Sequence, residues 1–140
     1  MALTYFPVTA ILKAAVSDTS TDPDGDPDIQ FVSSFVYFAP SEAQVYDPTD
    51  ATIYRLTTIK ARTNPADGAL KNIDGTTVHL VANTPTLEDL QGNIIETLIY
   101  TVTFDHTVYG EANQEIQPFR FLAPVDATPV DLASVERLPA

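Results

Sequence analysis

Short apolar segments, separated by prolines and glycines, dominate the pattern along the chain. Eleven prolines and five glycines divide the 140 residues, and the segments between them are rich in Thr, Val and Ile, which favour strands. The segment IQPFRFLAP at residues 116–124 places Phe119 and Phe121 on one face and Arg120 on the other. The clearest alternation is LIYTVTFD at residues 98–105, whose apolar face consists of Leu98, Tyr100, Val102 and Phe104. Alternation of this kind predicts antiparallel strands with one buried face.

Five further segments carry strand patterns bounded by turn residues, and they cover residues 3–16, 29–40, 51–63, 69–75 and 76–84. Pro7 should bend the first of them, and Pro40 should end the second. Asp74-Gly75 lies between the last two and predicts a tight hairpin turn.

Helical character is confined to two short places. In TPTLEDLQGNII, residues 84–95, Thr86 could cap a helix with Asp89 at its third position. A glycine and two β-branched residues would end that helix early, so we expect a turn or a short helix at most. A single helical turn is also plausible at Asp131–Val135. The sequence therefore predicts an all-β single domain over residues 1–140, an antiparallel β-sandwich of seven to nine short strands with at most one short helix.

An acidic stretch, DTSTDPDGDPD at Asp18–Asp28, places five aspartates in eleven residues. A helix-loop-helix calcium loop requires Gly at its sixth position and Glu at its twelfth. Frames that start at Asp22 or at Asp24 place neither residue there. We therefore expect a solvated acidic loop between two strands, and a looser calcium site stays the alternative.

The net charge is −12, and it is unevenly distributed. Such a field repels phosphate backbones, so we expect no nucleic-acid partner. Residues 51–80 form a mildly basic middle, whose bases are Arg55, Lys60, Arg62 and Lys71. The simplest interpretation is the polar face of a strand pair, and the alternative is an electropositive patch that docks on an acidic neighbour.

Nothing in the sequence predicts an active site. The chain has no cysteine, which excludes disulfides and thiol catalysis. His79 and His106 share no metal-binding motif, and Ser33 and Ser34 stand inside a predicted strand without a nucleophile elbow. We therefore expect no enzyme, no catalytic or metal-binding residue and no cofactor. No apolar run approaches the roughly 18 residues of a membrane span, so no membrane association is expected.

Tyrosines offer one further possibility, a stacking platform for sugars, to which six residues could contribute: Tyr5, Tyr37, Tyr46, Tyr54, Tyr100 and Tyr109. Most aromatic residues in strands lie in the core or in cross-strand pairs, so we favour a core role for them.

Four passages in order resemble small structural proteins of tailed phages that infect actinobacteria, usually described as minor tail proteins. They are an Asp-Pro-Asp stretch leading into a V-x-F-x-P strand at Asp22–Pro40, an L-x-x-I-D-G turn at Leu70–Gly75, a Y-x-V-x-F strand at Tyr100–Phe104, and an F-x-F-x-A-P ending with V-D-L at Phe119–Val135. The resemblance extends from about residue 18 to the end of the chain.

This resemblance implies a virion structural protein assembled in the host cytoplasm, without enzymatic activity. The expected role is that of a minor tail protein or tail adaptor, and the expected partners are other phage tail or capsid subunits, with the chain present as a homo-oligomer or in many copies. Some related chains continue into a fibre, whereas this sequence ends at LPA, which favours a compact subunit. The alternatives are a capsid decoration protein and, in a different class, a carbohydrate-binding module for host recognition.

Overall fold

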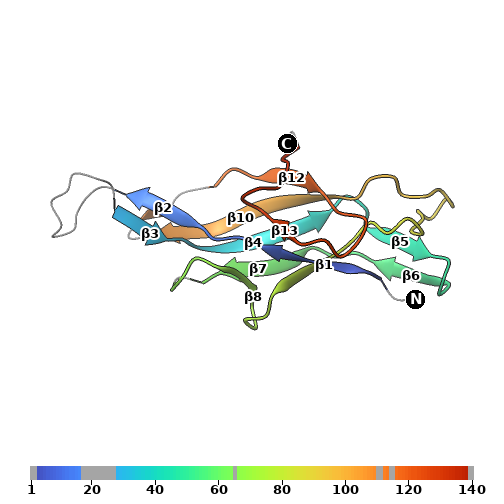
Figure 1. Cartoon of the computed structure of the whole chain (residues 1–140), viewed down its shortest axis with the longest axis horizontal. Coiled ribbons are helices and arrows are strands. Elements are labelled where there is room, and N and C mark those ends of the chain that lie inside the picture. The colour runs from blue at the N-terminus through green and yellow to red at the C-terminus, as the bar shows by residue number, and fades with distance from the viewer. Residues whose placement is uncertain (1–2, 17–27, 65, 110–111, 114–115, 139–140) are drawn as a thin grey trace.

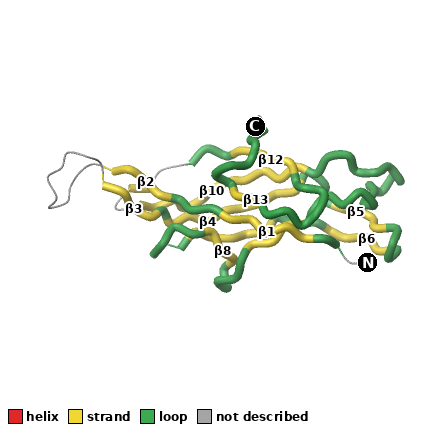
Figure 2. Tube along the Cα trace, viewed as in Figure 1, coloured by secondary structure: helices red, strands yellow, loops and turns green. Residues whose placement is uncertain are grey.

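The computed structural model describes residues 3–16, 28–64, 66–109, 112–113 and 116–138. Within them the chain forms thirteen strands. Figure 2 shows these residues coloured as strand or loop, without helix. The strands are β1 (Tyr5–Thr9), β2 (Lys13–Val16), β3 (Asp28–Phe31), β4 (Ser33–Pro40), β5 (Gln44–Asp47), β6 (Thr52–Arg55), β7 (Ile59–Thr63), β8 (Leu70–Asn72), β9 (Val78–Val81), β10 (Ile99–Tyr109), β11 (Ala112–Asn113), β12 (Phe119–Leu122) and β13 (Val130–Asp131). No helix in this part of the chain is long and apolar enough to cross a membrane.

Two sheets form the body of the molecule, and two hairpins extend from it. The larger sheet has the order β11–β10–β4–β7–β8, and β12 also pairs with β10. The smaller sheet has the order β13–β1–β9. The hairpins β2–β3 and β5–β6 lie at opposite ends of the elongated molecule (Figure 1). The predicted all-β sandwich is confirmed, and the one parallel pair among the described strands is β1–β13.

The core lies between the two sheets and is built from the alternate residues of their strands. Phe6 of β1 contacts Tyr100 and Phe121 of the larger sheet, with ring centroids 6.1 Å and 6.3 Å apart. Tyr100 and Phe121 stack on each other at 5.9 Å. Phe38 of β4 is also fully buried. Each of these aromatic side chains stabilises the fold by about 2–3 kcal/mol through burial, so the aromatic cluster holds the sheets together.

The predicted face assignments are correct for the strands with the clearest alternation. In β10, Tyr100 and Val102 are buried, as is Leu98 just before the strand. In β12, Phe119 and Phe121 point inward while Arg120 points out. The second expected strand ends at Pro40 as predicted.

The structure has more strands than the expected seven to nine, because three of the expected strands are each divided in two and because β5, β11 and β13 form where no strand was expected. Residues 3–16 form β1 and β2, and Pro7 lies inside β1 rather than at the bend. Residues 51–63 form β6 and β7. Residues 29–40 break at Val32, where the Thr63 hydroxyl donates to the Val32 carbonyl at 2.6 Å and accepts from the Ser34 amide at 2.9 Å. A residue distant in sequence therefore creates this break.

The hairpin predicted at Asp74-Gly75 is wrong in its pairing, although the turn itself forms. Gly75 has a positive φ of 88°, and its amide donates to the Asn72 carbonyl. The strands on either side do not pair with each other, because β8 joins β7 in the larger sheet and β9 joins β1 in the smaller one. The turn therefore carries the chain from one sheet to the other.

The two segments with helical character form turns. Within residues 84–95, Glu88 makes single bridges to Tyr46 and to Ile94, and the Thr86 hydroxyl is buried without a hydrogen-bond partner among the described residues. At Asp131–Val135, the Val135 amide donates to the Asp131 carbonyl at 3.0 Å, which closes one helical turn.

Candidate functional site

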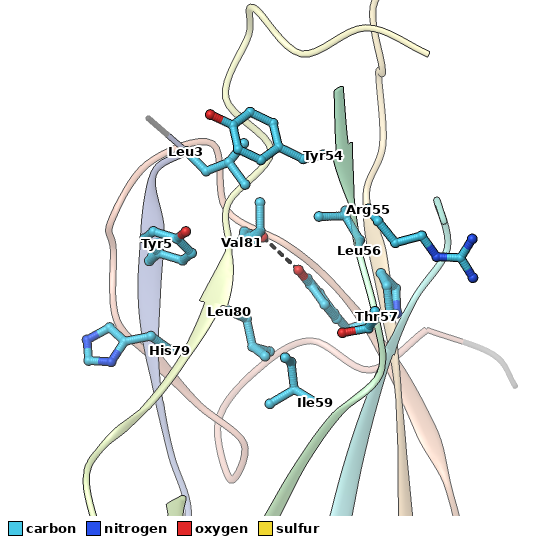
Figure 3. Close-up of a pocket in the computed structure, with 12 residues that line it drawn as sticks. Leu3, Tyr5, Tyr54, Arg55, Leu56, Thr57, Ile59, His79, Leu80 and Val81 are labelled. Atoms are coloured by element: carbon cyan, nitrogen blue, oxygen red, sulfur yellow. Dashed lines mark hydrogen bonds between the residues drawn. The ribbon is translucent and has the colours of Figure 1, made fainter. Parts of the chain in front are cut away.

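A cleft of about 230 Å³ opens between the two sheets at one edge of the sandwich (Figure 3). Tyr5 and His79 of the smaller sheet line its rim, and the His79 ring points away from the other lining residues in Figure 3. Tyr54 of β6 and Ile59 of β7 line it from the other side. Tyr100 of β10 forms part of its wall. The sandwich brings these side chains together because the ends of β1 and β9 lie across from the β6–β7 segment, although up to 95 residues separate them in the sequence.

The floor of the cleft is held by the Tyr100 phenol. Its hydroxyl donates to the Val81 carbonyl across the two sheets at 2.9 Å, the hydrogen bond drawn in Figure 3. Burial raises the pKa of Tyr100 well above its usual value. Because Tyr100 is only 2% exposed, it connects the two sheets through this hydrogen bond and offers no surface on which a sugar could stack.

Tyr54 is held at the mouth of the cleft by a carboxylate. Its hydroxyl donates to Oδ2 of Asp50 at 2.5 Å. This hydrogen bond lowers the pKa of Asp50 and raises the pKa of Tyr54. The other carboxylate oxygen, Oδ1 of Asp50, is buried and has no hydrogen-bond partner within the described residues. The pair therefore fixes the Tyr54 ring without a free acid facing the cleft.

The remaining polar residues of the cleft do not form a catalytic arrangement. Nδ1 of His79 lies 3.1 Å from the Thr77 carbonyl, and its ring is exposed. Arg55 points away from the cleft in Figure 3. Among the described residues, no acidic side chain lines the cleft, so none of them orients His79 for acid–base work there.

The other residues considered for chemistry lie apart from this cleft. Ser34 is buried, and its hydroxyl donates to the Phe35 carbonyl at 3.0 Å and to the Asp105 carbonyl at 3.3 Å. Ser33 pairs with Val108 at the start of β4. His106 belongs to β10, but its side chain lies outside the described part. No group of three or more His, Asp or Glu among the described residues could hold a metal ion.

The acidic stretch Asp18–Asp28, predicted to be a solvated loop with a looser calcium site as the alternative, lies outside the described residues apart from the backbone of Asp28 in β3. The solvated loop therefore stays a prediction.

The six tyrosines do not assemble into one platform. Tyr5 and Tyr54 share the cleft, whereas Tyr37 lies on the opposite face of the larger sheet and Tyr46 on β5. The side chain of Tyr109 is outside the described residues. The cleft is also smaller than the roughly 300–1,000 Å³ of most ligand pockets. It can hold a few atoms of a ligand, such as one small ring, but not an extended glycan.

A different surface gathers most of the basic residues. We call it the outer face: the side of the larger sheet that points away from the core, formed by Phe35, Tyr37, Lys60, Arg62, Lys71, Thr103, Asp105 and Arg120. Strand register places Lys71 opposite Arg62 and Arg62 opposite Phe35. Lys60 lies opposite Tyr37, with its Nζ 4.3 Å from the centroid of the Phe35 ring.

The outer face therefore combines three of the four bases that the sequence singled out. Arg55 is absent from it, because β6 belongs to a separate hairpin. Arg120 joins instead through its pairing with Thr101 of β10. The sequence pattern at residues 116–124 already placed Arg120 on the outward side of its strand, and this position could have been used to predict that Arg120 belongs to the outer face.

A second exposed surface lies at the β5–β6 end of the molecule. Tyr46 pairs with Ile53 and bridges to Glu88, which bridges to Ile94, so these four side chains share one side of a small ledge. Ile53 is 62% exposed and Ile94 58%. Val45 on the inward side is fully buried, so the ledge is anchored to the core while its outer side stays apolar.

No protein-family model matches the chain, and searches of curated proteins and of solved structures likewise found no match.

Proposed function

We propose that this chain is a structural protein of a tailed-phage particle, a minor tail protein or tail adaptor that acts through protein–protein contacts. The observation that carries the proposal is the ordered set of four passages that resemble such proteins. In the structure these passages supply β4, β8, β12 and part of β10 in the larger sheet, together with β3 of the β2–β3 hairpin and β13 of the smaller sheet. The resemblance therefore concerns the framework of the fold, which is what related assembly subunits have in common.

The surfaces of the molecule support an assembly role. The cleft is small and contains no acid–base pair, whereas the exposed features are larger and suited to contacts. They are the basic outer face and the apolar ledge with Ile53 and Ile94. Exposed apolar patches and clustered arginines are typical of protein interfaces.

A capsid decoration protein is the second candidate, and the elongated shape favours it. The β2–β3 hairpin exposes Ile29 and Phe31 at one end, and the ledge exposes Ile53 at the other. A subunit with contact surfaces at both ends can bridge two neighbours on a shell, where many weak contacts add up.

The copy number in particles distinguishes the two locations and tests the proposal. Particles produced by cells that express the chain would be purified, and the chain would be quantified against the major capsid protein by mass spectrometry. A few copies per particle would support the tail role, and hundreds would support decoration. If the chain is absent from intact particles but abundant in the lysate, the proposal is wrong.

The carbohydrate-binding alternative would use the cleft. It requires Tyr5 and Tyr54 to stack on a sugar ring, so the variant Tyr5→Ala/Tyr54→Ala should abolish binding to host cell-wall fragments. Tyr37→Ala is the matched control, since Tyr37 is half-buried on the opposite side of the sheet. If the wild type does not bind these fragments even at millimolar sugar, this alternative is excluded.

A further inference from the structure

The outer face concentrates positive charge in a chain that is otherwise strongly acidic. Its described residues include four bases and one acid, Asp105. The rest of the sequence contains eighteen acids and only three bases. Alternation along the strands causes this separation, because Ala61 and Thr63 of β7 face the core while Lys60 and Arg62 face outward.

Three of these bases occupy one corner of the sheet without a carboxylate to neutralise them. Arg62 and Lys71 are direct cross-strand partners, and like charges in that position repel. Lys60 lies two residues before Arg62 on the same side of β7. Within the described residues no ion pair is recorded for any of the three.

The nearest acids in sequence, Asp67 and Asp74, lie in turns and not on the outer face. Oδ1 of Asp67 accepts the amide of Ala69 at 3.0 Å. Oδ1 of Asp74 accepts the hydroxyl of Thr76 at 2.6 Å and its amide at 3.0 Å, and these two contacts lower the pKa of Asp74. Both carboxylates therefore stabilise the turns at the two ends of β8. The fold leaves the repulsion in this corner uncompensated, which an acidic partner would relieve.

The same face offers flat aromatic surface beside the charges. Phe35 and Tyr37 are half-buried and stand next to each other on β4, outside the core. Lys60 lies over both rings, 4.3 Å from the centroid of Phe35 and 5.8 Å from that of Tyr37. Aromatic side chains surrounded by basic ones are typical of protein interfaces that exclude water at their centre.

We propose that the outer face docks on the acidic surface of a second copy of this chain, in a head-to-tail arrangement. Charge complementarity selects this occupant, because a neighbouring copy presents an excess of acids outside its own outer face. Exposed carboxylates outside the outer face include Asp126, Asp131 and Glu136. Two outer faces cannot meet each other, since their bases would repel, so the contact is heterologous and leaves a free binding surface at each end.

The contact is weak by itself and strong only in an array. The outer face spans five strands spaced about 4.8 Å apart, of which β7, β8 and β12 are only five, three and four residues long. The patch is therefore small, at the low end of specific interfaces. Exposed ion pairs contribute modestly and are screened by salt. The inference rests on the proposed function only in expecting copies to meet on one particle, and the purified chain alone suffices to test it.

The test is sedimentation velocity of the purified full chain over a wide concentration range, at about 20 mM and about 500 mM salt. The wild type should self-associate at low salt, grow beyond dimers as concentration rises, and dissociate at high salt. The variant Lys60→Glu/Lys71→Glu should associate at least tenfold more weakly. The control Lys13→Glu/Arg55→Glu has the same net charge and alters bases outside the outer face, so it should associate more strongly than the first variant. Circular dichroism would establish that both variants are folded.

Four results would overturn the proposal. A wild type that stays monomeric at the highest concentration and low salt excludes a second copy as the partner. Equal association of the two variants shows that net charge, and not the outer face, controls it. A dimer that does not grow further indicates a symmetric contact. Binding of a single-stranded oligonucleotide by the wild-type chain, lost in Lys60→Glu/Lys71→Glu, would assign the face to nucleic acid instead.

Discussion

Gly68 lies where three segments of the chain meet, and replacing it with alanine should destabilise the protein more than any other glycine substitution among the described residues. Its backbone has a positive φ of 70°. Its carbonyl accepts the Leu12 amide at 2.9 Å, and the Leu12 carbonyl accepts the Val32 amide at 3.0 Å. Leu12 therefore joins the β1–β2 connection to the turn after β7, which contains Gly68, and to the break between β3 and β4.

The expected loss has two parts that can be separated. A non-glycine residue with positive φ costs about 1–2 kcal/mol, partly offset by about 0.5 kcal/mol because alanine restricts the unfolded chain. A Cβ at Gly68 would also approach the Leu12 carbonyl oxygen closer than 3.0 Å, a distance that real Cβ contacts essentially never show. Since the obstacle is backbone, Leu12 must move and at least one hydrogen bond breaks, which adds about 1–3 kcal/mol. We expect Gly68→Ala to lower the free energy of unfolding by about 1.5–4.5 kcal/mol.

Gly75→Ala provides the matched control. Gly75 also has a positive φ, of 88°, but a Cβ there meets nothing within 4 Å, so only the conformational cost of about 1 kcal/mol should remain. Urea unfolding followed by circular dichroism would measure both variants against the wild type. If Gly68→Ala and Gly75→Ala lose the same free energy, the close approach of Leu12 does not stabilise this junction and the reasoning is refuted.

Two further predictions concern buried hydroxyl groups. Thr63→Val keeps the shape of the side chain but leaves the Ser34 amide and the Val32 carbonyl without their partner; it should destabilise by about 2–4 kcal/mol in urea unfolding, whereas Thr63→Ser should lose clearly less, and equal losses would contradict a role for the hydroxyl. Tyr100→Phe removes the hydrogen bond to Val81 and should lose about 1 kcal/mol at neutral pH. Because burial raises the pKa of Tyr100, wild-type stability should decline once the pH exceeds about 10, where the unfolded phenol ionises, and Tyr100→Phe should show a shallower decline; identical slopes in urea unfolding at rising pH would exclude this linkage.

Local patterns in the sequence were sufficient for the strands and turns that depend on neighbouring residues. The alternation around Tyr100 and Val102 reflects burial of one strand face, and such a pattern is visible without knowledge of the partner strands. The turn at Gly75 is equally local, since its positive φ suits glycine. Pro40 ends β4 where the pattern placed the end.

Features that depend on contacts between distant residues were not visible in the sequence. The break at Val32 requires Thr63, which comes 31 residues later. The turn at Gly75 predicted a hairpin because strand partners were assumed to be neighbours, whereas β9 pairs with β1. The cleft escaped prediction for the same reason, since Tyr5 and Tyr54 line it only when the smaller sheet and the β5–β6 hairpin are both in place.

In the larger sheet, the residues that stabilise the core and the residues of the outer face lie on opposite sides of the same strands. Residues that hold the sandwich together and residues that carry its charge alternate along the same strands, so Ala61 is fully buried between the exposed Lys60 and the half-buried Arg62. Changes on the outward positions should therefore leave the free energy of unfolding within about 0.5 kcal/mol of the wild type. The charge reversal in Lys60→Glu/Lys71→Glu also removes the repulsion between residue 71 and Arg62, and this change favours the folded chain. A loss of self-association in that variant can then be assigned to the surface, because the core beneath it is unchanged.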